Sequence, residues 1–421
     1  MCSIIGWYGN IDREEKEHIL ATANERGRDG YGFYIELNGD PLELRKLSST
    51  IIPEHREMIL SSDKVVGNFR ATPTTEAEST ESNLQPYEGI VHNGTIANDK
   101  DIMDCPIDSM VLPYLLRKDD WNYPEWLHDK LGELVGSYAI AFFKTDQLVL
   151  ACNYKPIYFR RDKHSIQFAS TPNMIMYESS PMDPYSSLTA SVYYDELYVD
   201  KEKMEKKQNN KVLVSASSGL DSTTVAYMLQ KKYDVTLCYF TYGCLAEAKE
   251  YDRIKKIAEH GNFKLVTIDM PRIMEGTITK GTYHKDKIEG TEYAVDWVSA
   301  RNLLMLSLLT AYAESNEYGY IAFGGNLEES GAYPDNEQEF GRKFNEILPY
   351  SVQNGVAVTL LQPVSTYMKH EIVKLGIEHN VPFNLTWSCY SDEDKHCDNC
   401  APCFMRKTAF ERNGQMDPVF A

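Results

Sequence analysis

The sequence predicts a two-part fold, in which layered sheets flanked by helices are followed by a parallel sheet covered by helices. The chain has 421 residues, a length typical of two or three domains. An almost wholly polar stretch, DKEKMEKKQNNK at residues 200–211, separates two halves with different patterning. Short alternating apolar runs fill the first half, whereas apolar runs alternate with helical segments in the second. We therefore expect domains at residues 1–200 and 211–421, joined by a linker at 201–210.

The first half is expected to be α+β and the second a doubly wound α/β domain. In the first half, helices are predicted at residues 14–25 and 109–117, and strands at 31–37, 64–69, 138–143 and 147–153. In the second half, strands are predicted at 212–217, 235–242, 264–270 and 320–325, and helices at 222–232, 247–260 and 299–316. Strands that alternate with helices indicate βαβ units and therefore a parallel sheet.

Charge and composition narrow the classes of function. The net charge is −19, and residues 1–200 carry 32 acidic against 18 basic side chains. Such acidity argues against broad binding to a phosphate backbone, although it leaves room for a local basic cleft. No apolar run approaches the roughly 18 residues of a membrane span. The N-terminus lacks the pattern of a secretory signal, so we expect a cytoplasmic protein without a membrane partner.

The chain has nine cysteines, an odd number, so they cannot all pair with one another. In a reducing compartment cysteines are usually buried, catalytic or metal-bound. Four of them gather near the end of the chain, and the last three form overlapping C-x-x-C pairs. Four thiolates at this density predict a structural, closed Zn²⁺ site. Its predicted ligands are Cys389, Cys397, Cys400 and Cys403.

Polar motifs in the first half suggest a nucleophilic site. Cys2 would carry a free α-amino group beside its thiol if Met1 is removed, and such an amine can serve as the base. In the Asn-Phe-Arg-Ala-Thr segment, Arg70 can grip a carboxylate with two hydrogen bonds. Asn93 and Gly94 follow a short apolar pair and offer an amide and a backbone N–H for an oxyanion hole.

In this order, and with the glycine-rich segment RGRDGYG at 26–32, these motifs resemble the glutaminase domain of class II amidotransferases. The resemblance covers about the first 180 residues and implies an αββα N-terminal-nucleophile hydrolase. It implies that Cys2 attacks the amide carbon of glutamine and that Asn93 and Gly94 hold the oxyanion. Arg70 would bind the substrate carboxylate and Asp108 its α-ammonium group.

Some positions of this half keep a second interpretation. Asp108 precedes a predicted helix and could simply cap it, and Arg70 could form a surface ion pair. Thr72 is expected in the glutamine pocket, but Ala71 stands where some members of the family have tryptophan and Pro73 replaces a polar residue. We therefore expect the rim of the pocket to differ from the family.

A phosphate loop is predicted between the first strand and helix of the second half. Backbone N–H groups of such a turn, together with the helix N-terminus, bind phosphate, although a plain capped helix is the alternative. The segment resembles the pyrophosphatase loop of adenylating enzymes, Ser-Gly-Gly-x-Asp-Ser, with a serine in place of the first glycine. The resemblance implies ATP with Mg²⁺. The predicted ATP-binding residues are Ser217, Ser218, Gly219, Leu220, Asp221 and Ser222, with Thr241 on the adenine side.

Segments after this loop resemble the QueC family of 7-cyano-7-deazaguanine synthases over residues 211–412. They read TYGCLAEAKE, ARN, GAYPDNEQEF, QPVSTYMKHEIVKLG, TWSCY and CDNCAPCFMRKTAF. The resemblance implies that ATP activates 7-carboxy-7-deazaguanine and that ammonia then converts the activated carboxylate to the amide. A further activation by ATP dehydrates the amide to the nitrile. It suggests Arg301, Asn302 and Asp335 as base-binding or loop-ordering residues and Lys369 as a phosphate contact. Asn336 and Cys244 depart from the family pattern.

Together the two halves predict a glutamine-dependent, ATP-using amidotransferase of 7-deazaguanine metabolism. One alternative is an archaeosine-type synthase that adds ammonia to the nitrile of a base, free or in DNA or tRNA. An asparagine synthetase shares the domain order, but the cysteine cluster and the Tyr-Pro-Asp segment argue against it. The last alternative is a binding protein that is stabilised by zinc and has no catalytic activity. The sequence leaves open whether the protein forms a homo-oligomer.

Overall fold

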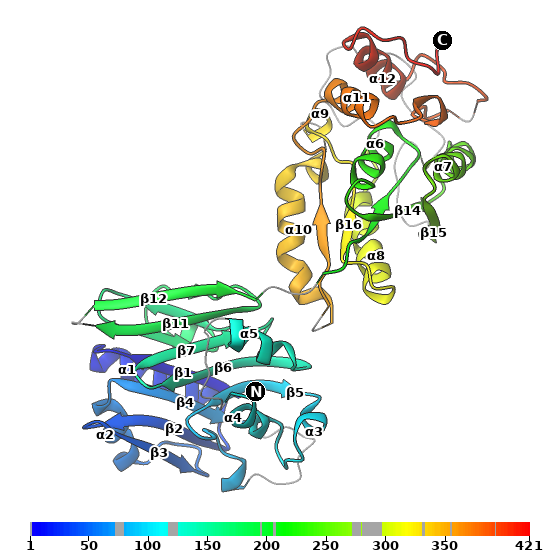
Figure 1. Cartoon of the computed structure of the whole chain (residues 1–421). Helices are drawn as coiled ribbons and strands as arrows, with labels where there is room; N and C mark the ends of the chain where they lie inside the picture. Colours follow the sequence, from blue (N-terminus) through cyan, green and yellow to red (C-terminus); the bar gives the residue numbers. More distant parts are fainter. Residues whose placement is uncertain are drawn as a thin grey trace. The chain divides into compact units, whose positions relative to one another are not determined.

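The computed structural model describes residues 2–71, 80–116, 125–193, 196–204, 208–271, 279, 297–330, 333–353, 356–391 and 393–421. The chain divides into two compact units, Met1–Lys206 and Lys207–Ala421, which are described separately below (Figure 1). The boundary lies inside the polar stretch 200–211. Among the described residues, no helix is long and apolar enough to cross a membrane.

Two antiparallel sheets build the first unit. The seven-stranded sheet has the order β10-β8-β9-β1-β4-β2-β3, and the five-stranded sheet has the order β12-β11-β7-β6-β5. The strands of the first sheet are β1 (Ser3–Tyr8), β2 (Gly30–Leu37), β3 (Asp40–Lys46), β4 (Lys64–Arg70), β8 (Tyr158–Arg161), β9 (Ile166–Ala169) and β10 (Ser180–Pro181). Those of the second are β5 (Val91–Ile96), β6 (Gly136–Lys144), β7 (Gln147–Cys152), β11 (Ser186–Tyr193) and β12 (Glu196–Lys203).

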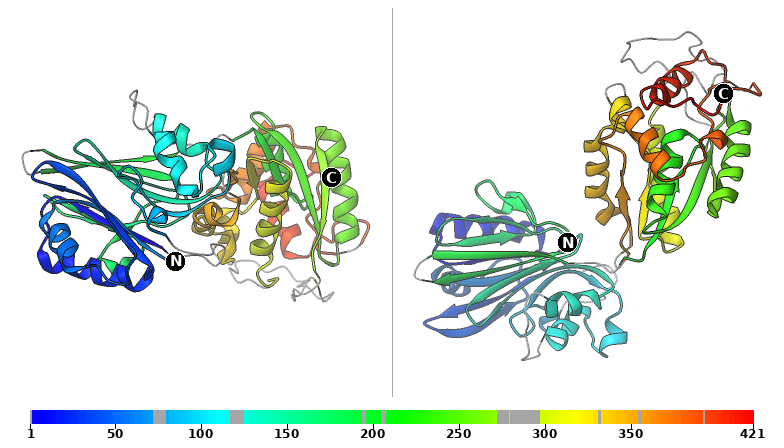
Figure 2. Two further views of the ribbon diagram at one scale, coloured as in Figure 1. Left: turned by 90° about the horizontal axis from the view of Figure 1, so that it is seen from below. Right: turned by 45° about the horizontal axis from the view of Figure 1, so that its top comes forward.

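Three apolar layers hold these elements together. Ile4, Val66 and Leu150 belong to the layer between the two sheets. Figure 2 shows the blue and green strands of these two sheets lying against each other. A second layer joins the seven-stranded sheet to α1 (Arg13–Arg26) and α2 (Pro53–Ser61), and a third joins the five-stranded sheet to α4 (Val111–Leu116) and α5 (Glu125–Gly132). Strands of this kind are apolar on both faces because both faces are covered. The unit is therefore a four-layer αββα sandwich, which confirms the predicted fold.

A five-stranded parallel sheet forms the centre of the second unit, in the order β15-β14-β13-β16-β17. The strands are β13 (Lys211–Ser215), β14 (Asp234–Thr241), β15 (Lys264–Asp269), β16 (Tyr320–Ala322) and β17 (Thr359–Leu361). The chain moves outward from β13 to β15 and then crosses to the other side with β16. Ligands of such sheets bind at the carboxyl ends of the strands, at the point where the order reverses. Here that point lies between β13 and β16.

Helices cover both faces of the parallel sheet, as expected of a doubly wound fold (Figure 1). One apolar cluster joins the sheet to α6 (Leu220–Leu229), α7 (Glu247–Gly261), α11 (Lys369–Glu378) and α12 (Ala401–Glu411). The opposite cluster joins it to α8 (Arg301–Ser315) and α10 (Gln338–Ser351). The remaining short helices are α3 (Asp99–Ile102) in the first unit and α9 (Leu327–Ser330) in the second.

Element boundaries differ from the sequence expectations in a few places. The helix expected at 109–117 begins as a 3₁₀ turn, Asp108–Met110, before α4. The strand expected at 320–325 ends at Ala322, because Gly324 and Gly325 belong to the turn that packs against the phosphate loop. Asn93 and Gly94 lie within strand β5.

Candidate active sites and metal centre

Cys2 and Arg70 are neighbours at one end of the seven-stranded sheet. β1 runs antiparallel to β4 with Ser3 opposite Phe69, so the residues just before β1 and at the end of β4 meet. The Cys2 Sγ lies 3.4 Å from the backbone N of Ala71 and 3.5 Å from its carbonyl oxygen. The Arg70 guanidinium is buried and donates to the carbonyl of Asn83 at 3.1 Å. The Cys2 thiol and the buried Arg70 guanidinium therefore lie at the same end of the sheet.

The predicted oxyanion-hole residues come from the facing sheet. The side-chain amide of Asn93 donates to Ser170 Oγ at 3.2 Å, and Ser170 Oγ in turn accepts from the backbone N–H of Ile4 at 2.9 Å. Asn93 is thus tied to β1 two residues beyond Cys2. A Cβ atom on Gly94 would lie 2.0 Å from the carbonyl oxygen of Ser137, so only glycine fits there.

A buried network of polar side chains contacts strand β5, which carries Asn93 and Gly94. His92 Nδ1 lies 2.8 Å from Ser109 Oγ, and the backbone N–H of His92 donates to Gln85 Oε1 at 2.5 Å. Burial lowers the pKa of His92, which keeps the ring neutral, although the nearby Asp108 carboxylate opposes that shift. The Asp108 oxygens accept from the backbone N–H groups of Ile96 at 2.8 Å and Ser109 at 2.7 Å. Asp108 therefore orders the backbone next to β5.

Sequence reasoning missed two contributors to this region. The His92 network was not foreseen, although the histidine stands directly before Asn93. Burial lowers the pKa of Lys155, and Arg26 lowers it further, whereas the Cys2 thiol acts in the opposite direction. The Lys155 ammonium therefore lies within electrostatic range of the Cys2 thiol. Nothing in the sequence pattern singled out this lysine. Thr72, predicted in the glutamine pocket, lies outside the described residues.

A cavity of about 970 Å³ opens at the switch point of the parallel sheet. Its lining comes from the carboxyl ends of β13, β14 and β16, from the first turns of α6 and α8, and from α11 and α12. Its volume suits a nucleotide together with a second small molecule. Five of the six predicted phosphate-loop residues line it: Ser217, Gly219, Leu220, Asp221 and Ser222.

The sixth, Ser218, explains how the loop tolerates its departure from glycine. Ser218 is fully buried and has a φ of +60°, in the left-handed region that glycine favours. Its carbonyl accepts from the backbone N–H of Trp387 at 2.9 Å, which holds the strained residue in place. A Cβ on Gly324 would lie 3.0 Å from the backbone N of Ser222, so a glycine at this turn lets β16 approach the loop.

Lys369 lies in an ion-paired cluster beside the phosphate loop. Its Nζ is 2.6 Å from Asp221 Oδ2 and 2.7 Å from Glu329 Oε1, and the lysine side chain is 11% exposed. Burial opposes the charge of Lys369, but the two carboxylates outweigh it and raise the pKa of the ammonium. Asp221 Oδ1 is buried and accepts no hydrogen bond from the described residues. That oxygen is available to a cation or a water of a bound nucleotide.

Arg301, Asn302 and Asp335 line the same cavity, as do Cys244 and Asn336. Asn302 Nδ2 donates to Asn336 Oδ1 at 3.1 Å, and Asn336 Nδ2 donates to Glu329 Oε2 at 3.3 Å. Asparagine at 336 thus links the predicted base-binding residues to the lysine cluster.

The structure also separates one predicted residue from this site. Thr241 is not among the residues that line the cavity, and its hydroxyl donates to Asp269 Oδ1 on the neighbouring strand β15. Its neighbours Phe240 and Tyr242 do line the cavity. The position of Thr241 at the end of β14 was therefore not enough to predict that its side chain lines the cavity.

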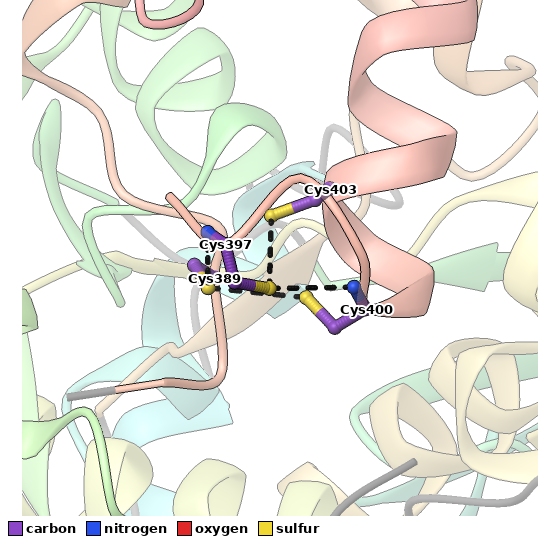
Figure 3. A group of neighbouring side chains, drawn as sticks. All are labelled: Cys389, Cys397, Cys400 and Cys403. Carbon is purple, nitrogen blue, oxygen red and sulfur yellow. Dashed lines mark hydrogen bonds between the residues drawn. The ribbon is translucent and has the colours of Figure 1, made fainter. Parts of the chain in front are cut away.

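The four clustered cysteines form a set that can hold one metal ion (Figure 3). Their sulfur atoms all lie within 4.8 Å of one another, with 4.0 Å between Cys397 and Cys403 and 3.9 Å between Cys389 and Cys400. Zinc–sulfur bonds of about 2.3 Å in a tetrahedron place sulfurs about 3.8 Å apart, so the geometry fits Zn²⁺. Three of the four cysteines are fully buried, as expected of a closed structural site.

Comparison with known proteins gives results for both the second unit and the whole chain. Residues 211–414 match the family model described as "Queuosine biosynthesis protein QueC". A "7-cyano-7-deazaguanine synthase 2" of Sulfurisphaera tokodaii is 39% identical over 100% of this chain and 99% of its own. A "7-cyano-7-deazaguanine synthase" of Sulfolobus acidocaldarius is 38% identical over the same shares of the two chains.

A shorter relative and a solved structure were also found. A "7-cyano-7-deazaguanine synthase" of Methanothermobacter thermautotrophicus is 33% identical and covers 48% of this chain and 95% of its own. A glutamine phosphoribosylpyrophosphate amidotransferase from B. subtilis is 12% identical, with a TM-score of 0.41 and 96% of each chain covered. The first two relatives span the αββα unit as well as the parallel-sheet unit. The chain is therefore an enzyme of the 7-cyano-7-deazaguanine synthase (QueC) family, in a form that carries an additional N-terminal unit.

Proposed function

We propose that the protein is a glutamine-dependent 7-cyano-7-deazaguanine synthase, in which the first unit releases ammonia and the second uses it. The observation that carries the proposal is the single cavity that contains both the phosphate loop and Arg301, Asn302 and Asp335. One space then holds the nucleotide and the acceptor that it activates. The names of the two relatives that span both units supply the class of product, a 7-cyano-7-deazaguanine, and we infer 7-carboxy-7-deazaguanine as the acceptor.

In the first unit, the contacts of each residue suit one part of glutamine hydrolysis. Cys2 would attack the amide carbon, and Arg70, charged and buried, would bind the substrate carboxylate. Asn93 is held by Ser170 with its amide toward β1, and Gly94 leaves its backbone N–H unobstructed by a side chain. Such donors stabilise the oxyanion that develops during attack. Asp108 would bind the α-ammonium group with the oxygen lone pairs that its backbone contacts leave available.

In the second unit, the phosphate loop and Lys369 would hold the phosphates of ATP. Bound ATP would supply an adenylate or similar leaving group on the carboxyl oxygen of the acceptor. Asp221 would contribute its buried Oδ1 to the Mg²⁺ ion that accompanies ATP. The four cysteines would hold Zn²⁺ as a structural ion, because no position remains for water. None of the nine cysteines forms a disulfide, which favours a reducing, cytoplasmic location.

The proposal is tested by product analysis with a nucleophile variant. Wild-type protein and C2A are supplied with ATP, 7-carboxy-7-deazaguanine and either glutamine or ammonium, and the products are identified by mass spectrometry. We expect the nitrile base from wild type with either nitrogen source, and from C2A only with ammonium. Failure of ammonium to rescue C2A would contradict the division of labour between the units. Formation of an amidine, or of asparagine from aspartate, would replace the proposed substrate with one of the alternatives.

A further inference from the structure

One acidic side chain in the cavity of the second unit has neither an ion pair nor a strong hydrogen-bond donor among the described residues. Five carboxylates line the cavity. Asp221 and Glu329 pair with Lys369, Glu328 accepts from the backbone N–H of Lys369 at 3.0 Å, and Asp335 accepts hydrogen bonds from Asn302. The fifth acid is Glu250, in the first turn of α7.

The carboxylate of Glu250 is nearly free to accept hydrogen bonds. Its only side-chain hydrogen bond among the described residues is from the Tyr239 hydroxyl, at 3.4 Å. That hydroxyl has a shorter contact, 3.1 Å, with the carbonyl oxygen of Glu247, and it has a single proton to donate. Buried carboxylates without donors are costly and are usually retained for a ligand. Glu250 therefore lines the cavity with a carboxylate that has acceptor capacity left for a ligand.

The surroundings of Glu250 indicate which ligand edge it meets. Arg301, the first residue of α8, lies close enough to interact with Glu250 electrostatically and is itself held beside the ring of Tyr242, 6.0 Å from the ring centroid. The guanidinium of Arg301 can donate hydrogen bonds to a ligand, and the carboxylate of Glu250 beside it can accept them with two oxygens. The rings of Trp297 and Tyr333, which also line the cavity, are stacked at 6.0 Å with 12° between their planes. Flat aromatic walls favour a flat aromatic ligand.

A guanine-type ring presents the complementary pattern along one edge: a carbonyl oxygen, a ring N–H and an exocyclic amino group. Adenine, by contrast, has no two adjacent N–H donors of this kind. We propose that Glu250 is a specificity-determining residue of this cavity, whose carboxylate accepts hydrogen bonds from the ring N–H and the 2-amino group of the base, with Arg301 on the carbonyl side. The inference rests on the proposed function, which supplies a 7-deazaguanine as the acceptor.

Protonation of Glu250 provides a second, independent readout. Burial raises the pKa of Glu250 to about 7, while Arg301 and the Tyr239 hydrogen bond lower it and Glu247 raises it. Other ionisable groups close to this set are Cys244 and Tyr242, whose pKa values burial also raises, so both stay neutral near pH 7. Because only the carboxylate form accepts two hydrogen bonds, affinity for the base rises as the pH rises through about 7.

The test compares two ligands and three proteins by isothermal titration calorimetry on the full chain. The ligands are 7-carboxy-7-deazaguanine and the analogue that lacks the 2-amino group, and the proteins are wild type, E250Q and E259Q. Glu259 is exposed on the same helix and serves as the matched control. Wild type and E259Q should prefer the amino-bearing base by roughly 10- to 100-fold, the range of a hydrogen bond to a charged group. E250Q should bind that base more weakly, lose the preference and lose the pH dependence.

The outcomes separate this inference from the proposed function. If wild type binds and converts the base but E250Q keeps the full preference for the 2-amino group, the inference is wrong and the proposed function stands. If wild type binds neither base, both the proposed function and the role of Glu250 are contradicted. Calorimetric unfolding and ATP affinity of E250Q check that the variant is folded, because Glu250 lies outside the phosphate loop.

Discussion

Replacing Lys369 with methionine should expose how strongly the cavity depends on its buried cation. Methionine keeps the length and apolar stem of lysine but removes the charge that lies 2.6 Å from Asp221 and 2.7 Å from Glu329. Breaking a buried pair costs about 3–5 kcal/mol, because it leaves uncompensated charge. Glu329 is 30% exposed, so solvent relieves part of this cost, and we expect the lower end, about 3 kcal/mol. For a unit of this size that corresponds to a fall in Tm of about 6–12 °C.

Differential scanning calorimetry on K369M, on K369M/E329Q and on the control K374M measures this effect. Lys374 is exposed on the same helix, α11, so K374M should stay within about 0.5 kcal/mol of wild type. The double variant removes one of the two carboxylates that K369M leaves without a cation. Its free energy of unfolding should therefore be at least about 1 kcal/mol higher than that of K369M. A loss below about 1 kcal/mol in K369M, or a double variant that is no more stable than K369M, would refute the view that one cation balances two buried acids.

Three further outcomes follow from the geometry. C403S should lose the bound zinc, measured by elemental analysis at about one ion per wild-type chain, whereas C238S should keep it; zinc retained by C403S would argue against the four-thiolate site. G94A should lower glutamine-dependent turnover by roughly 10²–10³-fold, because the new Cβ meets the carbonyl of Ser137, while ammonium-dependent turnover is preserved. The affinity of wild type for the base should increase between about pH 6 and pH 8, since burial raises the pKa of Glu250 to about 7; a flat profile would contradict the role given to its carboxylate.

Features that depend on local periodicity were predictable from the sequence. The alternation of apolar runs and helical segments identifies β13, α6, β14 and α7 within a few residues, because each element buries its own apolar face. The C-x-x-C spacing likewise places four sulfurs within 4.8 Å, since the ligands are close along the chain. Family membership was predicted from the resemblance of whole motifs to known families, and both it and the two folds are confirmed.

Features that depend on contacts between distant segments were not predictable. Glu250 reads as an ordinary helical glutamate until β14 and α8 bring Tyr239 and Arg301 to it. Thr241 was assigned to the adenine side from its place at a strand end, but its hydroxyl donates to Asp269 on the neighbouring strand. Ser218 looked like a defect in the phosphate loop, and only the backbone shows a serine held at a φ of +60°. The binding and catalytic roles of the individual residues remain predictions.

The most direct test of the central claim follows one nitrogen atom from glutamine to the base. Wild-type protein is incubated with ATP, 7-carboxy-7-deazaguanine and glutamine labelled with ¹⁵N in its amide, in the presence of unlabelled ammonium. Mass spectrometry of the nitrile base should show the label in most of the product, and C2A should incorporate only unlabelled nitrogen. Product that carries only unlabelled nitrogen in wild type would show that the N-terminal unit is not the source of ammonia.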